Sequence, residues 1–183
     1  DLPLRAALSP ALYEDSLSDL GILYTALGKG DRAIKYLEGA VRLRLQFHGE
    51  DNLEYASLLH NLAMAYGLQG QFKRSCAYYE RSLELTDKHQ GKQHPDYRST
   101  LNNLATSYKR LGDVHKSIEL MQQLIENTAE TAGKDNPHYL TYLHNLGALY
   151  LELGENDLAA PLVCETLTLR RSFLDKTYGV LSE

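Results

Sequence analysis

Three common features are missing from this sequence, and each absence excludes a class of protein. No apolar run approaches the roughly 20 residues that span a bilayer, and no signal-peptide pattern is present. The net charge of −5 lacks the positive excess that general nucleic-acid binding requires. The two cysteines, Cys76 and Cys164, lie far apart without a CxxC spacing. We therefore expect no membrane insertion, no nucleic-acid partner, no disulfide framework, no zinc site and a reducing, cytoplasmic location.

The composition that remains is that of an ordinary globular protein. The 183 residues are 43% hydrophobic and 23% charged, which suffices for one sizeable domain with a substantial buried core. The sequence begins at Asp1 rather than at a methionine. We therefore expect it to be part of a longer chain, so that targeting segments are not seen.

A period of 42 residues runs through the sequence. Four columns keep this step: Gly28, Gly70, Gly112 and Gly154; Tyr24, Tyr66, Tyr108 and Tyr150; Leu17, Leu59, Leu101 and Leu143; Leu20, Leu62, Leu104 and Leu146. Columns in one phase predict an array of four repeats. We place a single array at residues 11–173, with repeats at 13–52, 53–94, 95–136 and 137–176. Residues 1–10 and 174–183 are then flanking segments of a longer chain.

Each repeat predicts two helices. The first helix carries the leucine and tyrosine columns on one apolar stripe and ends at the glycine, which suits the left-handed position after a helix. Near the start of the second helix stand possible capping residues, Asp31, Asp113 and Asn156. The second helix alternates small and large residues, as in Ala33, Leu37 and Ala40 or Ser75, Tyr79 and Ser82. The predicted class is all-α, built from four antiparallel helix pairs.

These columns resemble the tetratricopeptide repeat. Its small residue at the eighth position matches Gly21, Ala63, Ala105 and Gly147, and its aromatic residue at the eleventh matches the tyrosine column. The period exceeds the usual 34 residues by about two helical turns. With the NNLA stretch at 102–105 and the loop His94–Pro95–Asp96, it is similar to the kinesin light chain subclass. The resemblance implies a right-handed superhelical solenoid whose first helices line a concave groove.

The polar arc of the first helix supplies the candidate groove residues. In the third repeat this arc carries Ser99, Asn102, Asn103, Thr106, Lys109 and Arg110. Asn103 aligns with Asn61 and Asn145, and with Asp19 in the first repeat. An asparagine amide is both donor and acceptor, and the resemblance implies that Asn61, Asn103 and Asn145 grip the backbone of an extended peptide. The alternative is that these amides bond a neighbouring helix and set the superhelical pitch.

The same columns extend the candidate site. Asn102 aligns with His60 and His144. Lys109 and Arg110 make the third repeat a basic spot that could receive an acidic side chain or a terminal carboxylate. Met64 adds apolar surface for a hydrophobic anchor. The alternatives are a solvated pair of surface charges and a methionine buried against the adjacent repeat.

No signature of catalysis or of metal binding occurs. The sequence contains no GxSxG, HExxH or Walker-type loop. His60 and His144 stand two repeats apart, too far to share a metal. Cys76 falls in an isoleucine column and is predicted to be a core residue, whereas Cys164 falls in a polar column and is predicted to be partly exposed. We expect neither an enzyme nor a cofactor or metal site.

A stack of repeats suits recognition, because its surface side chains can vary without harm to the core. The favoured interpretation is a protein–protein interaction module of an intracellular adaptor or scaffold. It would bind an extended peptide, acidic where it meets Lys109 and Arg110. Two alternatives stay open. One is a structural or self-assembly segment, whose last repeat meets further repeats or a second copy. The other is a non-catalytic regulatory region of a larger enzyme.

Overall fold

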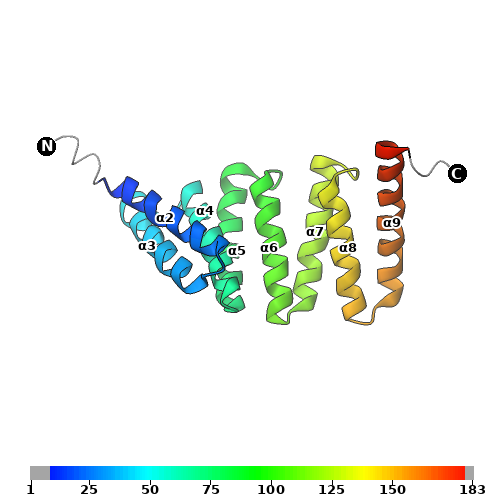
Figure 1. The fold of residues 1–183 in the computed structure, drawn as a ribbon, viewed down its shortest axis with the longest axis horizontal. Coiled ribbons are helices and arrows are strands. Elements are labelled where there is room, and N and C mark those ends of the chain that lie inside the picture. Colours follow the sequence, from blue (N-terminus) through cyan, green and yellow to red (C-terminus); the bar gives the residue numbers. More distant parts are fainter. Residues whose placement is uncertain (1–8, 180–183) are drawn as a thin grey trace. The chain divides into compact units, whose positions relative to one another are not determined.

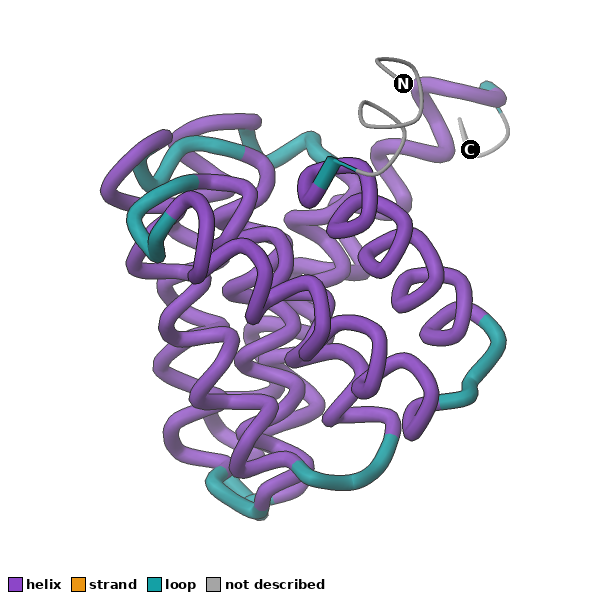
Figure 2. Tube along the Cα trace, turned by 90° about the vertical axis from the view of Figure 1, so that its left-hand side faces the viewer, coloured by secondary structure: helices purple, strands orange, loops and turns teal. Residues whose placement is uncertain are grey.

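The computed structural model of the chain describes residues 9–179 (Figure 1). Segments 1–8 and 180–183, which belong to the predicted flanking segments, lie outside the described residues. The described residues form eight α-helices and contain no strand (Figure 2). The all-α class predicted from the repeat is therefore confirmed. The chain divides into two compact units, Asp1–Gly112 and Asp113–Glu183.

The first unit holds five helices: α2 (Pro10–Ala26), α3 (Gly30–His48), α4 (Leu53–Leu68), α5 (Phe72–Gln90) and α6 (Pro95–Leu111). Each of them packs on the next in sequence, and α4 also contacts α2 and α6. The first helices of three successive repeats therefore lie side by side. The core between the helices includes Leu37, Leu59 and Leu62, which are at most 1% exposed.

The second unit holds three helices: α7 (Val114–Ala132), α8 (Pro137–Glu152) and α9 (Asn156–Tyr178). Helix α8 packs on both α7 and α9. Tyr139, Leu140 and Leu143 form the centre of its core, with Ile125 and Leu162 packed against them.

The starts of the first helices are set by side-chain caps. Ser9, Asn52, His94 and Asn136 each accept a backbone N–H in the first turn of α2, α4, α6 and α8. Such caps satisfy amides that the helix itself leaves unpaired. The ends follow the glycine column, since Gly28, Gly70, Gly112 and Gly154 all have positive φ, between 68° and 95°. Glycine is the one residue that adopts this conformation without a steric penalty. The predicted ends of the first helices are therefore confirmed.

The predicted caps of the second helices are only partly right. Asp113 accepts from the N–H of Lys116 at 3.0 Å and caps α7. Asp31 and Asn156 instead lie inside the first turns of α3 and α9, whose N-caps make no side-chain hydrogen bond. At α3 a side chain from the next repeat takes the place of the cap. In the amide orientation that satisfies both groups, Gln69 accepts from the N–H of Asp31 at 3.1 Å.

The leucine columns are buried in the second, third and fourth repeats but not in the first. Leu59, Leu62, Leu101, Leu104, Leu143 and Leu146 are at most 5% exposed. Leu20 is 38% exposed, so its assignment to the buried stripe was wrong. The physical reason is that α2 is the first described helix, and no described helix precedes it to cover that face.

Tyrosine side chains tie each repeat to the second helix of the repeat before it. Tyr66 donates to Glu38 at 2.6 Å, and Tyr108 donates to Glu80. The third bond is reversed, with Gln122 Nε2 donating to the Tyr150 hydroxyl at 3.0 Å. In each pair the two residues are 28 positions apart. Burial, together with the hydrogen-bonded carboxylate of Glu38, raises the pKa of Tyr66 to about 12.

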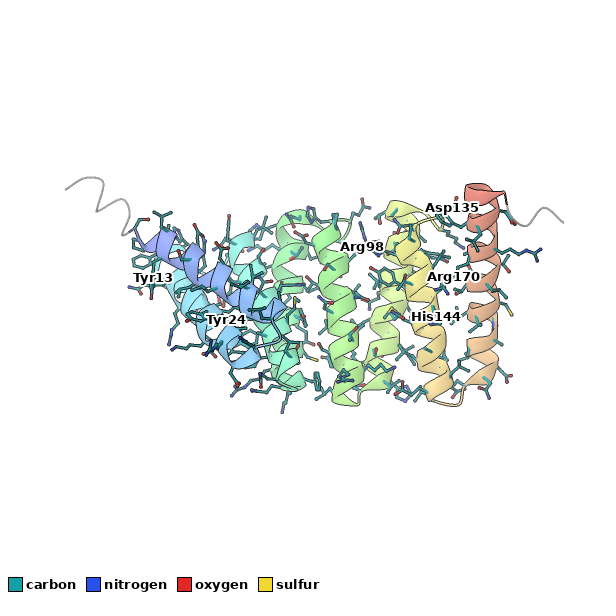
Figure 3. The ribbon with its side chains drawn as sticks, in the orientation of Figure 1. Tyr13, Tyr24, Arg98, Asp135, His144 and Arg170 are labelled. Atoms are coloured by element: carbon teal, nitrogen blue, oxygen red, sulfur yellow. The ribbon has the colours of Figure 1, made fainter. Side chains whose placement is uncertain are left out.

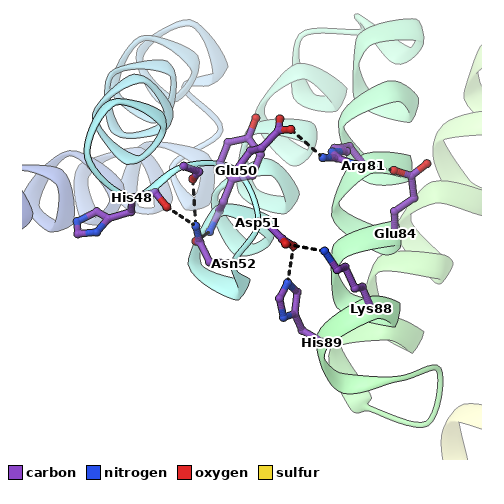
Figure 4. A network of polar contacts seen from close by, with 10 residues as sticks. His48, Glu50, Asp51, Asn52, Arg81, Glu84, Lys88 and His89 are labelled. Atoms are coloured by element: carbon purple, nitrogen blue, oxygen red, sulfur yellow. Dashed lines mark hydrogen bonds and ion pairs between the residues drawn. The ribbon is translucent and has the colours of Figure 1, made fainter.

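The loop between α3 and α4 is held against α5 by charged groups (Figure 4). Asp51 contacts Lys88 Nζ at 2.5 Å and His89 Nε2 at 2.8 Å. The hydrogen bonds from Lys88 and then His89 lower the pKa of Asp51. Arg81 contacts Glu84 at 3.0 Å and Glu50 at 3.5 Å. The contacts of Glu50 and Asp51 join the end of the first repeat to the second, whereas Arg81 and Glu84 both lie on α5.

Candidate functional site

An apolar groove of about 570 Å³ crosses the first helices of the first unit. Helices α2 and α4 contribute Ile22, Met64 and Leu68, α5 contributes Phe72, and α6 contributes Arg110. Ile22, Met64 and Leu68 are 46%, 38% and 51% exposed. Large apolar side chains are therefore presented to solvent here. We call this surface the apolar groove.

A second hollow, of about 330 Å³, lies between α4, α5 and α6. Its lining is mostly polar and comprises Leu53, Ser57, His60, Asn61, Ser82, Thr86, Gln90, Asp96, Ser99 and Thr100. Asn61 lines both surfaces, so it marks their junction. We call this second surface the polar hollow.

A hydrogen-bonded network links α4, α5 and α6 beside this junction. His60 Nε2 lies 3.4 Å from Asn103 Nδ2, and His60 Nδ1 lies 2.9 Å from Thr100 Oγ1. The His60 and Tyr79 rings meet edge to face with centroids 5.3 Å apart, and Asn103 also bonds the Tyr79 side chain. With the amide as donor, Nε2 is the acceptor, so neutral His60 carries its proton on Nδ1 and donates it to Thr100.

The titratable groups of this network are held neutral. Burial lowers the pKa of His60, and the negative charge of Asp96 opposes this only in part. Burial also raises the pKa of Tyr79. Protonation of His60 would turn its Nε2 into a donor facing the donor amide of Asn103. The network is therefore complete only with a neutral imidazole.

Replacing His60 with glutamine is expected to reduce the loss of stability in acid. The unfolded chain protonates His60 near its ordinary pKa of about 6.5, whereas the folded protein keeps it neutral to lower pH. Between these two values the unfolded state binds more protons, so the free energy of unfolding falls as the pH is lowered through that window. Urea unfolding at about pH 7.5 and about pH 5.5 measures the loss. Gln123→Ala, at an exposed position on α7, removes no titratable group and is the control, which should lose as much as the wild type. An equal loss in His60→Gln would contradict the assignment.

Asn61 differs from Asn103 in having no partner. It is half-buried and makes no side-chain hydrogen bond to any residue of the described range 9–179. Its amide therefore presents a free donor and a free acceptor at the junction of the two surfaces. Arg110, at the α6 side of the apolar groove, lies over the Phe72 ring at 5.5 Å from the centroid. This is a cation–π contact that positions the guanidinium group.

The structure distributes the predicted site residues over both units. Asn61, Met64, Asn103 and Arg110 line the apolar groove, while His60 and Ser99 line the polar hollow with Asn61. Asn102 and Lys109 are half-buried on α6 and belong to neither lining. Asn145 and His144 lie on α8 in the second unit, where Figure 3 labels His144. A peptide-binding role for these two stays a prediction.

Sequence reasoning missed Ile22 and Phe72 as groove residues. Ile22 stands 42 positions before Met64, so extending that column would have found it. Phe72 aligns with Gly30 and Val114, and this column carries no common chemistry. It enters the groove because α5 begins beside α6, which no single-helix pattern shows.

Both cysteines lie within residues 9–179. Cys76 is buried and Cys164 is exposed, as the column analysis predicts. In this range no group of three or more histidine, cysteine, aspartate or glutamate side chains is placed to hold a metal ion. None of the described helices is long and apolar enough to cross a membrane.

Comparison with known proteins assigns the class. The family model of the tetratricopeptide repeat matches residues 12–88, 56–127 and 96–172. The chain therefore belongs to the tetratricopeptide repeat family. None of the curated proteins compared with it matches.

Among solved structures, this chain is similar to kinesin light chain-like repeat proteins. BtubC (BKLC) from P. vanneervenii is 26% identical, with a TM-score of 0.81 over 90% of this chain and 66% of that protein. The putative kinesin light chain TPR-like repeats of Podospora anserina are 24% identical, with a TM-score of 0.77 over 90% of this chain and 76% of theirs. The resemblance to kinesin light chain-like repeats, expected from the 42-residue period, is confirmed. Tetratricopeptide repeats generally mediate protein–protein interactions and are typically non-catalytic, and no catalytic family is evident in these comparisons.

Proposed function

We propose that the first unit binds an extended segment of a partner protein along the apolar groove and acts as an adaptor or scaffold module. The observation that carries the proposal is the unpaired amide of Asn61 at the junction of the two surfaces. A peptide backbone offers an N–H and a C=O at each residue. One amide side chain can pair with both groups in a bidentate manner.

The groove around Asn61 supports the same occupant. Exposed Ile22, Met64 and Leu68 can bury an apolar side chain of the segment, and such burial is the main favourable term in association. Arg110, held over Phe72, offers its guanidinium group to a carboxylate. The favoured ligand is therefore an extended peptide with an apolar anchor and an acidic residue.

Asn103 takes a supporting role in this proposal. Its amide already contacts His60 and Tyr79, so it shapes the wall of the groove more than it grips a ligand. The sequence-based alternative, in which these asparagines bond neighbouring helices, fits Asn103 better than Asn61.

Replacing Asn61 with alanine is expected to weaken peptide binding about tenfold or more. The loss corresponds to two backbone hydrogen bonds, each worth about 0.5–1.5 kcal/mol. A peptide array identifies ligands of the wild type, and fluorescence polarisation of the hits measures their Kd. Gln123→Ala, which removes an exposed amide on α7, is the matched control and should bind as the wild type does. Wild-type affinity in Asn61→Ala would sink the proposal, as would an array without hits.

A second candidate is self-assembly through uncovered apolar faces. Within the described residues, α9 exposes Val163, Leu167 and Leu174 at 42%, 69% and 45%, and their spacing of four and seven residues places them on one face of the helix. Single exposed apolar residues are normal, but a contiguous apolar patch marks a contact surface. A mass in sedimentation that grows with protein concentration, and stops growing in Leu167→Glu, would favour this reading over peptide recognition.

A further inference from the structure

The polar hollow is rich in hydrogen-bond acceptors. Ser82 donates its hydroxyl proton to the backbone oxygen of Ala56 at 2.8 Å, and Thr86 donates to the backbone oxygen of Ser82 at 2.9 Å. Both side chains are almost fully buried, at 1% and 3% exposed. A hydroxyl has one proton to give. The oxygens of Ser82 and Thr86 can therefore offer only lone pairs to a group that enters the hollow.

The charge of the polar hollow is negative. Asp96 is the one acidic residue in its lining, and no lysine or arginine is among the lining residues in the described range. The backbone N–H of Asp96 donates to His94 Nδ1 at 3.2 Å. His94 Nδ1 is therefore the acceptor of this backbone N–H, and it lies 3.6 Å from the Asp96 carboxylate. His60, the other titratable residue in the lining, is neutral in the network described above.

We propose that the polar hollow is the subsite for a lysine or arginine side chain of the bound segment. An ammonium or guanidinium group has donors and no acceptor, which complements the Asp96 carboxylate and the oxygens of Ser82 and Thr86. The volume of about 330 Å³ is at the lower end of ligand pockets, which span about 300–1,000 Å³. This inference rests on the proposed function, because the segment in the apolar groove delivers the side chain.

The two surfaces together give the ligand a direction. Asn61 stands at their junction, with Asp96 in the polar hollow and Arg110 in the apolar groove. A segment with a basic residue on one side of its central backbone and an acidic residue on the other matches both. The reversed segment places like charges together, and such juxtapositions select against wrong partners.

A single capped amino acid tests the subsite without a peptide. The probe is Nα-acetyl-lysine methylamide, and its neutral match is the same molecule acetylated at Nε. Titration into the ¹⁵N-labelled protein is followed by NMR. The expected result is a saturable shift of amides around Ser57, Thr86 and Thr100 with the charged probe, and none with the neutral one. Equal responses to both probes, or no response to either, would overturn the subsite.

Three variants assign the response to the hollow. Asp96→Asn is expected to weaken binding of the lysine probe about fivefold or more, because it removes the charge and keeps the shape. Ser57→Lys places a competing ammonium group at an exposed lining position and is expected to abolish the response even if Asp96→Asn perturbs the start of α6. Asp15→Asn removes an exposed carboxylate on α2 outside both surfaces and should leave binding unchanged. Unchanged binding in both Asp96→Asn and Ser57→Lys would refute the assignment.

The outcomes separate this inference from the proposed function. If peptides bind through Asn61 and the lysine probe does not respond, the groove stands and the cationic subsite falls. If the lysine probe responds and the array yields no Asn61-dependent peptide, the subsite chemistry stands and the peptide-binding function falls.

Discussion

Replacing Glu14 with alanine is expected to lower the free energy of unfolding by about 3–5 kcal/mol. Glu14 lies on α2 with 3% exposure, and its Oε1 accepts from Nε and Nη2 of Arg44 on α3 at 2.7 Å and 2.6 Å. The Arg44 side chain is only 15% exposed. Removing the carboxylate leaves a largely desolvated guanidinium group without its partner. A buried charge without a partner lowers the free energy of unfolding by far more than the intact ion pair raises it.

The double replacement Glu14→Leu with Arg44→Met distinguishes this cause from a general loss of packing. Two apolar side chains of similar size leave no unpaired charge, so most of the stability should return. Arg81→Ala serves as the control, because Arg81 contacts exposed Glu50 and Glu84 and surface pairs are worth about 0–1 kcal/mol. Urea unfolding followed by circular dichroism measures all four proteins. A Glu14→Ala cost as small as that of Arg81→Ala would contradict the prediction.

Replacing Leu37 with alanine is expected to cost about 2–5 kcal/mol, the range for a buried leucine that leaves a cavity. Leu37 is 0% exposed. It packs where Gly21 has no side chain, since a Cβ at Gly21 would lie 2.4 Å from Leu37 Cγ. Gly21→Ala by itself should therefore cost about 1–3 kcal/mol through overpacking.

The double variant of Gly21→Ala and Leu37→Ala is the sharper measurement. The new methyl group at position 21 enters space that Leu37 has vacated. The loss of stability in the double variant should therefore be smaller than the sum of the two single losses by about 1 kcal/mol or more. Additive costs within about 0.5 kcal/mol would show that the two positions do not share a packing site. Leu20→Ala, at an exposed position on α2, should change stability by less than about 0.5 kcal/mol.

The repeat columns predicted most of the fold because each reports a local requirement. A glycine after every first helix and leucines on one stripe follow from backbone sterics and helix periodicity, and both can be counted along a sequence. Leu20 broke the rule because its burial depends on a preceding helix, not on α2 itself. Asp31 was misjudged for a similar reason, because Gln69 from the next repeat accepts its N–H.

The candidate site was only half predictable. Helix-wheel reasoning found Asn61, Met64, Asn103 and Arg110, since these share one arc of their helices. It left open that these amides bond a neighbouring helix, but it did not single out Asn103 or its partner His60, which lies 43 positions earlier. Hydrogen bonds between different repeats depend on how the helices pack. Aligning residues at the 42-residue period treats every repeat as equivalent. It therefore cannot distinguish the free amide of Asn61 from the hydrogen-bonded amide of Asn103.

The tyrosine bonds between repeats carry a consequence for engineering. The partners of Tyr66, Tyr108 and Tyr150 are Glu38, Glu80 and Gln122, and the fourth residue of that series is Cys164. A thiol is only a weak hydrogen-bond acceptor. A designer who grafts a further copy of the second repeat behind α9 would therefore replace the tyrosine–carboxylate hydrogen bond at that junction with a much weaker one. The graft needs Cys164→Glu on α9. A repeat can therefore be exchanged or added only when the preceding repeat supplies the partner of its tyrosine.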